Sequence, residues 1–183
     1  MADRTPMTDR ILAAADRLFY RKGIRAVGVD AVAAEAGISK RSLYDTFASK
    51  DALVAAYLRQ RIRPFVRSDE PPAQQVLALF DQLQARFEAA GFRGCPFVNA
   101  VAELGEDCDS VRAIAARYKA DRRRHIADLL DQAGAADPDA LAGQIALLFE
   151  GAIAAMLVGQ DASAAALARD AAAVLMRVGK VGL

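Results

Sequence analysis

Apolar residues recur along this chain with the spacing of one face of an α-helix. Near the N-terminus five of them follow the i, i+3, i+4, i+7, i+8 pattern. They are Ile11, Ala14, Ala15, Leu18 and Phe19. Thr8 precedes the pattern as an expected N-cap, and Gly23 follows it as an expected stop. The pattern therefore predicts an amphipathic first helix between these two residues.

Three shorter helices are predicted before the first proline-rich segment. The first covers about residues 29–36 and ends at Gly37. Ser39 is a good N-cap for a helix over 40–46, and Ser49 is a good N-cap for a helix that ends near Arg63, where Pro64 follows. The turn between the first two is only a few residues long.

Five more helices are predicted after Pro71 and Pro72. The boundaries come from apolar periodicity, from glycines and from the pair Asp137 and Pro138, which reads as an N-cap with N1 proline. They cover about residues 76–90, 97–103, 109–133, 138–158 and 164–178. Alanine fills 42 of the 183 positions, which favours helix over strand. We expect an all-α, nine-helix bundle without sequence repeats.

Composition narrows the cellular setting. Asp3 and Asp9 precede any apolar run, and Gln144 and Glu150 interrupt the longest apolar stretch, residues 140–159. Neither a signal peptide nor a membrane span is expected, so the cytoplasm is the predicted location. Two cysteines and one histidine cannot build a disulfide framework or a zinc site, and we expect no metal and no cofactor.

The net charge of +1 hides an asymmetry between the two parts of the chain. Residues 1–63 hold 12 Lys/Arg and 7 Asp/Glu, a net charge of +5. Residues 64–183 hold 12 and 16, a net charge of −4. A compact basic segment favours a nucleic-acid partner, although a solvated basic surface has the same composition.

Two short helices joined through residues 36–39 form the expected arrangement of a helix-turn-helix. In that arrangement the second helix enters the DNA major groove. Lys40, Arg41 and Ser42 lie on the first turn of this second helix, where side chains can reach base edges and phosphates. Short turns with glycine also occur in ordinary bundles, so the flanking charges carry the DNA-binding prediction.

These residues resemble the N-terminal domain of the TetR family of bacterial transcriptional regulators. The resemblance rests on residues 11–19, on Gly23 and Val29, and above all on the run EAGISKRSLYDTFASKDAL over 35–53. It covers about the first quarter to third of the chain. It implies a helix-turn-helix DNA-binding domain, expected over residues 1–56, and a helical ligand-binding and dimerisation domain, expected over residues 57–183.

The resemblance also implies roles for individual residues. Lys40, Arg41 and Ser42 would contact bases and backbone, while Tyr44 and Lys50 would contact phosphates. Ser39 would cap the recognition helix and approach a phosphate. The expected DNA-binding residues are Ser39, Lys40, Arg41, Ser42, Tyr44 and Lys50. Leu43 and Phe47 are expected in the core.

Two residues depart from what DNA binding would favour. Gly28 stands where the family often has Ser or Thr at the start of the second helix, so a side-chain phosphate contact is lost there. Asp45 lies near the recognition surface, where a carboxylate repels phosphate unless it accepts from a cytosine or pairs with a cation. We interpret Asp45 as a solvated residue.

The larger apolar side chains of the second domain are candidates for an effector pocket, with core packing as the alternative for each. They are Phe80, Leu83, Phe87, Phe97, Val101, Tyr118 and Phe149. Among polar groups, Asn99, Glu103 and His125 could reach a ligand, but surface exposure is favoured for them. Cys95, in the loop before a helix, could sense electrophiles or oxidants, and an inert thiol is the favoured alternative.

The last two predicted helices carry enough apolar residues to complete a four-helix interface across a two-fold axis, as the resemblance also implies. The candidate interface residues are Leu141, Ile145, Leu148, Ile153, Met156, Leu167, Val174, Leu175 and Val178.

No catalytic motif is present: there is no nucleophile elbow, phosphate-binding loop or histidine-rich metal helix. Together with the resemblance, this absence predicts a dimeric repressor rather than an enzyme or a helical adaptor, with activation of transcription as an open alternative. It would bind a pseudo-palindromic operator and be released by a small-molecule inducer. The helix from Lys50 to Arg63 joins the basic segment to the rest and is the expected transmitter of that signal.

Overall fold

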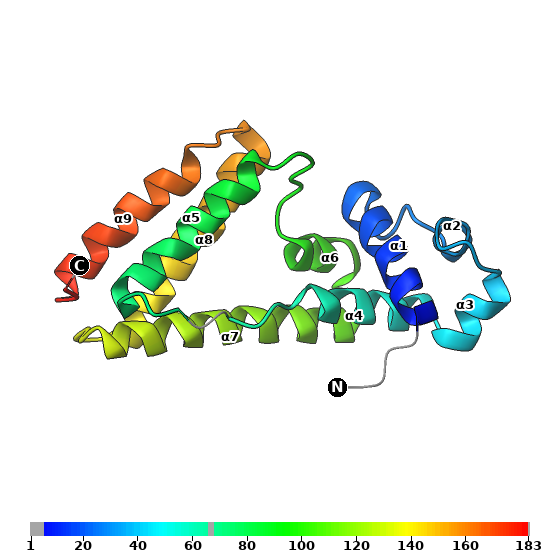
Figure 1. Ribbon diagram of the computed structural model, residues 1–183, viewed down its shortest axis with the longest axis horizontal. Coiled ribbons are helices and arrows are strands. Elements are labelled where there is room, and N and C mark those ends of the chain that lie inside the picture. The colour runs from blue at the N-terminus through cyan, green and yellow to red at the C-terminus, as the bar shows by residue number, and fades with distance from the viewer. Residues whose placement is uncertain (1–5, 66–67, 183) are drawn as a thin grey trace. The chain divides into compact units, whose positions relative to one another are not determined.

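The computed structural model describes residues 6–65 and 68–182, and within them it contains nine α-helices and no strand (Figure 1). The all-α prediction is confirmed. Asp3, used above against a signal peptide, lies outside the described residues. The helices are α1 (Pro6–Lys22), α2 (Val29–Glu35), α3 (Lys40–Thr46), α4 (Lys50–Arg61), α5 (Pro72–Glu88), α6 (Pro96–Leu104), α7 (Asp109–Gln132), α8 (Pro138–Gly159) and α9 (Ala164–Val178).

Most helix ends fall where local sequence signals place them. Asp137 caps α8 by accepting from the backbone N–H of Ala140 at 3.0 Å, with Pro138 at N1. The expectation that Thr8 caps the first helix is wrong, because α1 already begins at Pro6 and Thr8 lies inside its first turn. Proline lacks an N–H, which the first helical turn does not need, so it is tolerated at this start.

The chain forms two compact units that do not follow chain order. Unit 1 is Met1–Arg63 with Cys95–Tyr118, and unit 2 is Pro64–Gly94 with Lys119–Leu183. Unit 1 therefore holds α1 to α4, α6 and the first part of α7. The domains expected from the sequence, residues 1–56 and 57–183, are contiguous and differ from these units.

The core of unit 1 is built around α1, which packs against α2 and α4. Ile11, Leu43, Leu53 and Leu58 are completely buried. The Phe19 ring meets the Tyr57 ring edge to face with centroids 5.5 Å apart. Burial raises the pKa of Tyr57 to about 12, so this phenol stays protonated at neutral pH.

The core of unit 2 is formed by α9 packed against α8 and α5 (Figure 1). Phe80 of α5 meets Phe149 of α8 with ring centroids 5.7 Å apart. Asp81 of α5 pairs with Arg169 of α9 at 2.9 Å. Small side chains on the inner face of α9 allow this close approach, since Ala165 and Ala172 are fully buried.

Helix α8 is the one helix, among the described residues, that is long and apolar enough to cross a membrane by length and composition alone. A core helix of a water-soluble protein passes the same test. Leu141, Ile145 and Ile153 of α8 are buried within unit 2. Its apolar character is thus partly accounted for by packing inside the protomer.

His125 of α7 stacks on Phe65, with ring centroids 4.0 Å apart and planes 14° from parallel. Partial burial lowers the pKa of His125, while the nearby charge of Asp128 acts in the opposite direction. The folded protein therefore favours the neutral imidazole.

This shift makes stability depend on pH. Because the folded pKa lies below the unfolded value, the contribution of His125 is fully present above about pH 6.5 and declines as acidification protonates the unfolded chain first. Urea unfolding at pH 7.5 and 5.5, for wild type and His125→Gln, checks this. Relative to the variant, the wild type should lose free energy of unfolding on acidification, and an unchanged difference would contradict the assignment.

Candidate nucleic-acid interface

Helices α2 and α3 and the turn between them form a helix-turn-helix. Gly37 adopts φ +64°, a left-handed conformation that favours glycine, and the Ile38 N–H donates to the Ala33 carbonyl at 3.0 Å. Ser39 caps α3 as predicted, because its hydroxyl accepts from the Ser42 N–H at 3.1 Å. Gly28 caps α2 without any side-chain bond, as its identity requires.

The predicted DNA-binding side chains are presented from one end of this motif. Ser39, Lys40, Arg41 and Tyr44 are exposed. Ser42 is half-buried, with its hydroxyl 2.9 Å from that of Ser39. The α3 helix thus turns Leu43 into the core and leaves Lys40, Arg41 and Tyr44 toward solvent.

Lys50 opens α4 and is half-buried. Ser49 caps that helix as predicted by accepting from the Ala52 N–H at 3.1 Å. Phe47, expected in the core, is half-buried.

Lys40 has a carboxylate partner that the sequence reasoning did not consider. Its Nζ lies 3.0 Å from Oδ1 and 3.1 Å from Oδ2 of Asp30 on α2. The hydrogen bond and the charge of Asp30 raise the pKa of Lys40. Lys40 is therefore charged at neutral pH, and a DNA contact by its ammonium group would compete with Asp30.

Two arginines of α1 contact the end of α2 in the helix-turn-helix. Arg10 donates to the carbonyls of Ala36 at 2.6 Å and Gly37 at 3.1 Å, which satisfies carbonyls at the end of α2. Arg17 pairs with Glu35 at 2.9 Å. The i, i+7 spacing of Arg10 and Arg17 on one face of α1 is the sequence signal that would have indicated this role.

A bidentate ion pair connects α4 to α1. Arg61 donates from Nε to Oδ1 of Asp16 at 2.5 Å and from Nη2 to Oδ2 at 2.9 Å. The guanidinium also lies over the Tyr20 ring, 4.4 Å from its centroid. Planar bidentate pairing of this kind fixes orientation as well as distance.

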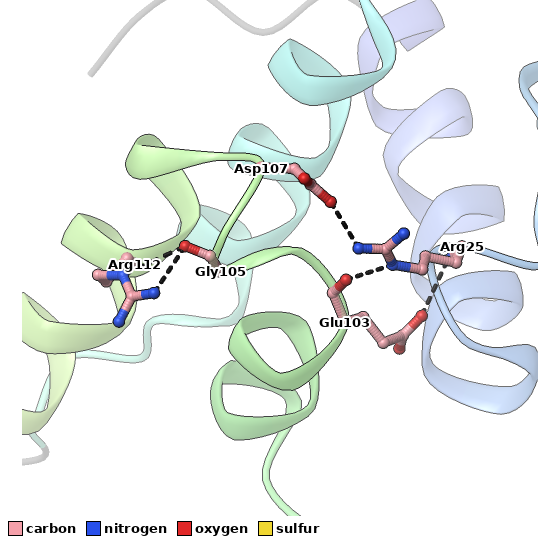
Figure 2. Close-up of polar contacts among 5 residues, drawn as sticks. All are labelled: Arg25, Glu103, Gly105, Asp107 and Arg112. Atoms are coloured by element: carbon pink, nitrogen blue, oxygen red, sulfur yellow. Dashed lines mark hydrogen bonds and ion pairs between the residues drawn. The ribbon is translucent and has the colours of Figure 1, made fainter.

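A fourth arginine, Arg25, connects the loop after α1 to the end of α6, and we call Arg25, Glu103 and Asp107 the Arg25 clasp (Figure 2). The Arg25 backbone N–H donates to Glu103 Oε2 at 2.8 Å. Its Nε donates to the Glu103 carbonyl, and its Nη2 donates to Asp107 Oδ2 at 2.5 Å. Glu103, expected to be a surface residue, thus contacts a residue 78 positions earlier in the chain.

These contacts change the interpretation of the basic charge in residues 1–63. Among the described residues of this segment, at least five Lys/Arg have acceptors within unit 1. They are Arg10, Arg17, Arg25, Lys40 and Arg61. Several cations of this segment therefore hold the motif in shape and do not simply form a DNA-facing surface.

The candidate interface helices α8 and α9 each carry an exposed apolar stripe. On α8 the stripe runs through Leu147 and Val158, which are 74% and 86% exposed, with Gly151 and Ala154 between them. On α9 the same spacing runs through Leu167, Val174 and Val178.

The candidate residues of these two helices are divided between surface and core. Leu167, Val174 and Val178 are exposed, and Leu148, Met156 and Leu175 are half-buried. Leu141, Ile145 and Ile153 are buried inside the protomer. Sequence reasoning missed Leu147 and Val158, because several registers of a mostly apolar helix satisfy the same periodicity.

The candidate pocket residues belong to both units. Phe97 and Tyr118 stack on each other within unit 1, centroids 3.9 Å apart, and Val101 of that unit is half-buried. Phe80, Leu83, Phe87 and Phe149 are buried in unit 2. Unit 2 contains a pocket of about 370 Å³ at the ends of α5 and α8. It is lined by Phe87, Ala89, Gly91, Phe92, Met156, Leu157 and Gln160.

Both cysteines, Cys95 and Cys108, are buried free thiols. The part of the chain that the structure describes holds no group of three or more His, Cys, Asp or Glu residues arranged for a metal ion.

Comparison with known proteins decides the family. The signature of bacterial regulatory proteins of the tetR family matches residues 11–57. That of the LmrA/YxaF-like transcriptional regulator C-terminal domain matches residues 72–171, more than half of the chain. The chain belongs to the TetR family. TetR-family proteins are DNA-binding transcriptional regulators and not enzymes, so the DNA-binding prediction and the non-enzyme prediction are both confirmed.

Solved TetR-family structures extend the similarity over the whole chain. A TetR-type regulator from Streptomyces avermitilis is 32% identical with a TM-score of 0.85, covering 98% of this chain and 100% of its own. A TetR-family regulator from Streptomyces coelicolor is 28% identical with a TM-score of 0.83, covering 94% and 95%.

A curated relative is similar over the DNA-binding part alone. An HTH-type transcriptional regulator from Mycobacterium tuberculosis is 41% identical over 63 residues, which are 34% of this chain and 31% of that relative. The match thus spans about a third of the relative's length.

Replacing single recognition residues of this TetR-family protein should separate base contacts from phosphate contacts. Arg41→Ala or Lys40→Ala should weaken operator binding by about 1–3 kcal/mol if a base is contacted, with little effect on a scrambled duplex. Lys50→Ala should weaken binding to both duplexes. Titrations of each variant on both duplexes measure this, and equal losses on both for every variant would exclude base reading.

Proposed function

We propose that this protein is a dimeric, ligand-responsive repressor of the cytoplasm. It binds a pseudo-palindromic operator and releases it when a small-molecule inducer binds. The observation that carries the proposal is the braced helix-turn-helix, with Lys40, Arg41 and Tyr44 exposed on α3. Charged and aromatic side chains on the first turns of a recognition helix suit base and phosphate contacts in the major groove.

Two copies are required because a single seven-residue recognition helix offers few contacts. The exposed stripes of α8 and α9 support a two-fold interface between copies of this chain. Exposed apolar side chains with regular helical spacing typically become buried in a partner. In a symmetric dimer the two α8 helices and the two α9 helices would together form a four-helix interface.

Charges placed in the α8 stripe should separate the dimer. The double variant Leu147→Glu with Val158→Glu should be monomeric, because burying unpaired carboxylates at an apolar interface is strongly unfavourable. Val98→Glu on α6 is the matched control, since Val98 is also exposed, at 49%, and lies outside the stripe. Sedimentation equilibrium measures the mass, and a dimeric double variant would contradict the proposed interface.

The inducer site is proposed at the unit 2 pocket between the ends of α5 and α8. Its volume of about 370 Å³ lies within the range of small-molecule sites, about 300–1,000 Å³. Phe87, Phe92 and Met156 contribute apolar side chains to its lining, and polar groups, Gln160 among them, form the larger part of its surface. An inducer that fits is therefore a small molecule that combines apolar and hydrogen-bonding groups. Phe87 is the member of the predicted pocket set that lines it.

Inducer and operator should each lower the affinity of the protein for the other by the same factor. An inducer releases DNA only if it binds the DNA-incompetent dimer more tightly, and a coupling of about 1–3 kcal/mol corresponds to about a 5–150-fold change in affinity. Calorimetry of a compound found by thermal-shift screening, with and without operator, measures this. Phe87→Ala should weaken its binding while leaving ligand-free operator binding nearly intact, and identical affinities with and without operator would exclude the mechanism.

Selection of genomic fragments with the purified protein tests the proposal as a whole. The expected result is a duplex with two inverted half-sites whose spacing matches two recognition helices, about one helical turn or a multiple of it. Expression of the neighbouring gene in cells with and without this protein then separates repression from activation.

A further inference from the structure

We infer that Glu103 and Asp107, two acidic residues outside the helix-turn-helix, are positioning residues for DNA binding. They act by holding the loop between α1 and α2 through Arg25. The inference rests on the proposed function, because it concerns binding to the operator. By their charge alone these two carboxylates would weaken DNA binding, whereas the inferred role strengthens it.

The loop that they hold determines where α2 begins. Residues 23–28 connect the two helices, and Ile24 and Val27 anchor the loop in the core with 3% exposure each. Gly28 contributes no side-chain cap to α2. Burial of Ile24 and Val27 does not fix the orientation of the backbone between them. The Arg25 clasp supplies polar contacts to this part of the loop.

The clasp fixes backbone as well as side chains. Glu103 Oε2 accepts from the Arg25 backbone N–H at 2.8 Å, and the Glu103 carbonyl accepts from the Arg25 guanidinium. An exposed ion pair between two flexible side chains contributes little by itself. Here one donor, the Arg25 N–H, and one acceptor, the Glu103 carbonyl, belong to the backbone, so the contact helps to set the position of the loop.

Gly23 shows how closely the Glu103 carboxylate covers this loop. A Cβ at Gly23 would lie 3.1 Å from Glu103 Oε2, and Gly23 adopts φ +88°. Glycine is favoured by this backbone conformation, and a side chain here would crowd the Glu103 carboxylate.

The backbone between Glu103 and Asp107 is also fixed by hydrogen bonds. Arg112 of α7 donates to the Gly105 carbonyl from Nη2 at 2.8 Å and from Nε at 3.2 Å, as Figure 2 shows. A Cβ at Gly105 would lie 2.6 Å from the Val101 carbonyl oxygen, so the tight turn after α6 requires glycine. The turn between α6 and α7 therefore presents Glu103 and Asp107 from a fixed backbone.

Removing one of these acids gives a test in which two explanations predict opposite signs. By charge alone, loss of a carboxylate from a DNA-binding unit raises affinity for DNA, since repulsion of phosphate decreases. If the carboxylate positions the α1–α2 loop, its loss lowers operator affinity. Glu106 provides the matched control, because it is an exposed acid in the same turn and outside the clasp.

The experiment uses the full-length protein and the tightest duplex recovered by selecting genomic fragments with the wild type. Glu103→Ala and Asp107→Ala should each bind this duplex about three- to tenfold more weakly, whereas Glu106→Ala should bind it equally or slightly more tightly. In an Arg25→Met background, Asp107→Ala should cause no further loss, because the guanidinium that Asp107 contacts is already absent. Thermal melting of each variant verifies that it is folded.

Amide hydrogen exchange reports the contact without DNA. The Arg25 amide should exchange faster in Glu103→Ala than in wild type or Glu106→Ala, since its acceptor is removed. Asp107→Ala leaves the Glu103 contacts in place and serves as the second variant if Glu103→Ala does not fold.

The outcomes separate this inference from the function on which it rests. A wild-type protein that selects no duplex overturns both. A wild type that selects a duplex, together with a folded Glu103→Ala that binds it as tightly as wild type or more tightly, overturns the positioning role and leaves the proposed function intact. Further loss on adding Asp107→Ala to Arg25→Met also overturns it, because the effect of Asp107 would then not pass through the Arg25 side chain.

Discussion

Two helices of seven residues each cannot keep their shape in water, and this constraint governs the rest of unit 1. Isolated helices shorter than about 12–15 residues are marginal even with favourable sequences, so α2 and α3 depend on what packs around them. Helix α1 supplies the buried face, and Arg10 satisfies carbonyls at the turn between them. The conformation of the recognition surface therefore depends on the contacts that α1 and Arg10 make with it.

Those supports come from distant parts of the sequence, which explains how much could be predicted from it. The helix-turn-helix was predictable because its signals are local: Ser39 and Ser49 cap the helices that follow them, and Gly37 has the left-handed conformation that the turn requires. Contacts such as Arg25 with Glu103 were not predictable, since neither residue carries a periodic or motif signal. Thr8 was misjudged because proline can begin a helix as readily as threonine can cap one.

The division of α8 and α9 into exposed and buried residues shows a second limit of prediction from the sequence. Helix α8 is apolar on nearly all sides, so periodicity alone does not determine which residues face the protomer core. Ile145 is fully buried while Leu147, two positions later, is 74% exposed. A pattern identifies such a helix and its length, but the choice of face is made by tertiary packing against α9 and α5.

The arginines that hold α1, α2 and α4 together also affect how such a regulator finds its site on a chromosome. A cation that is already paired within the protein releases fewer DNA counterions, so it adds less to sequence-independent binding. Pairing Lys40 with Asp30 at 3.0 Å reduces that background further. Weak background binding shortens each stay on unrelated DNA, and a protein present in few copies then spends more of its time sampling new sequence.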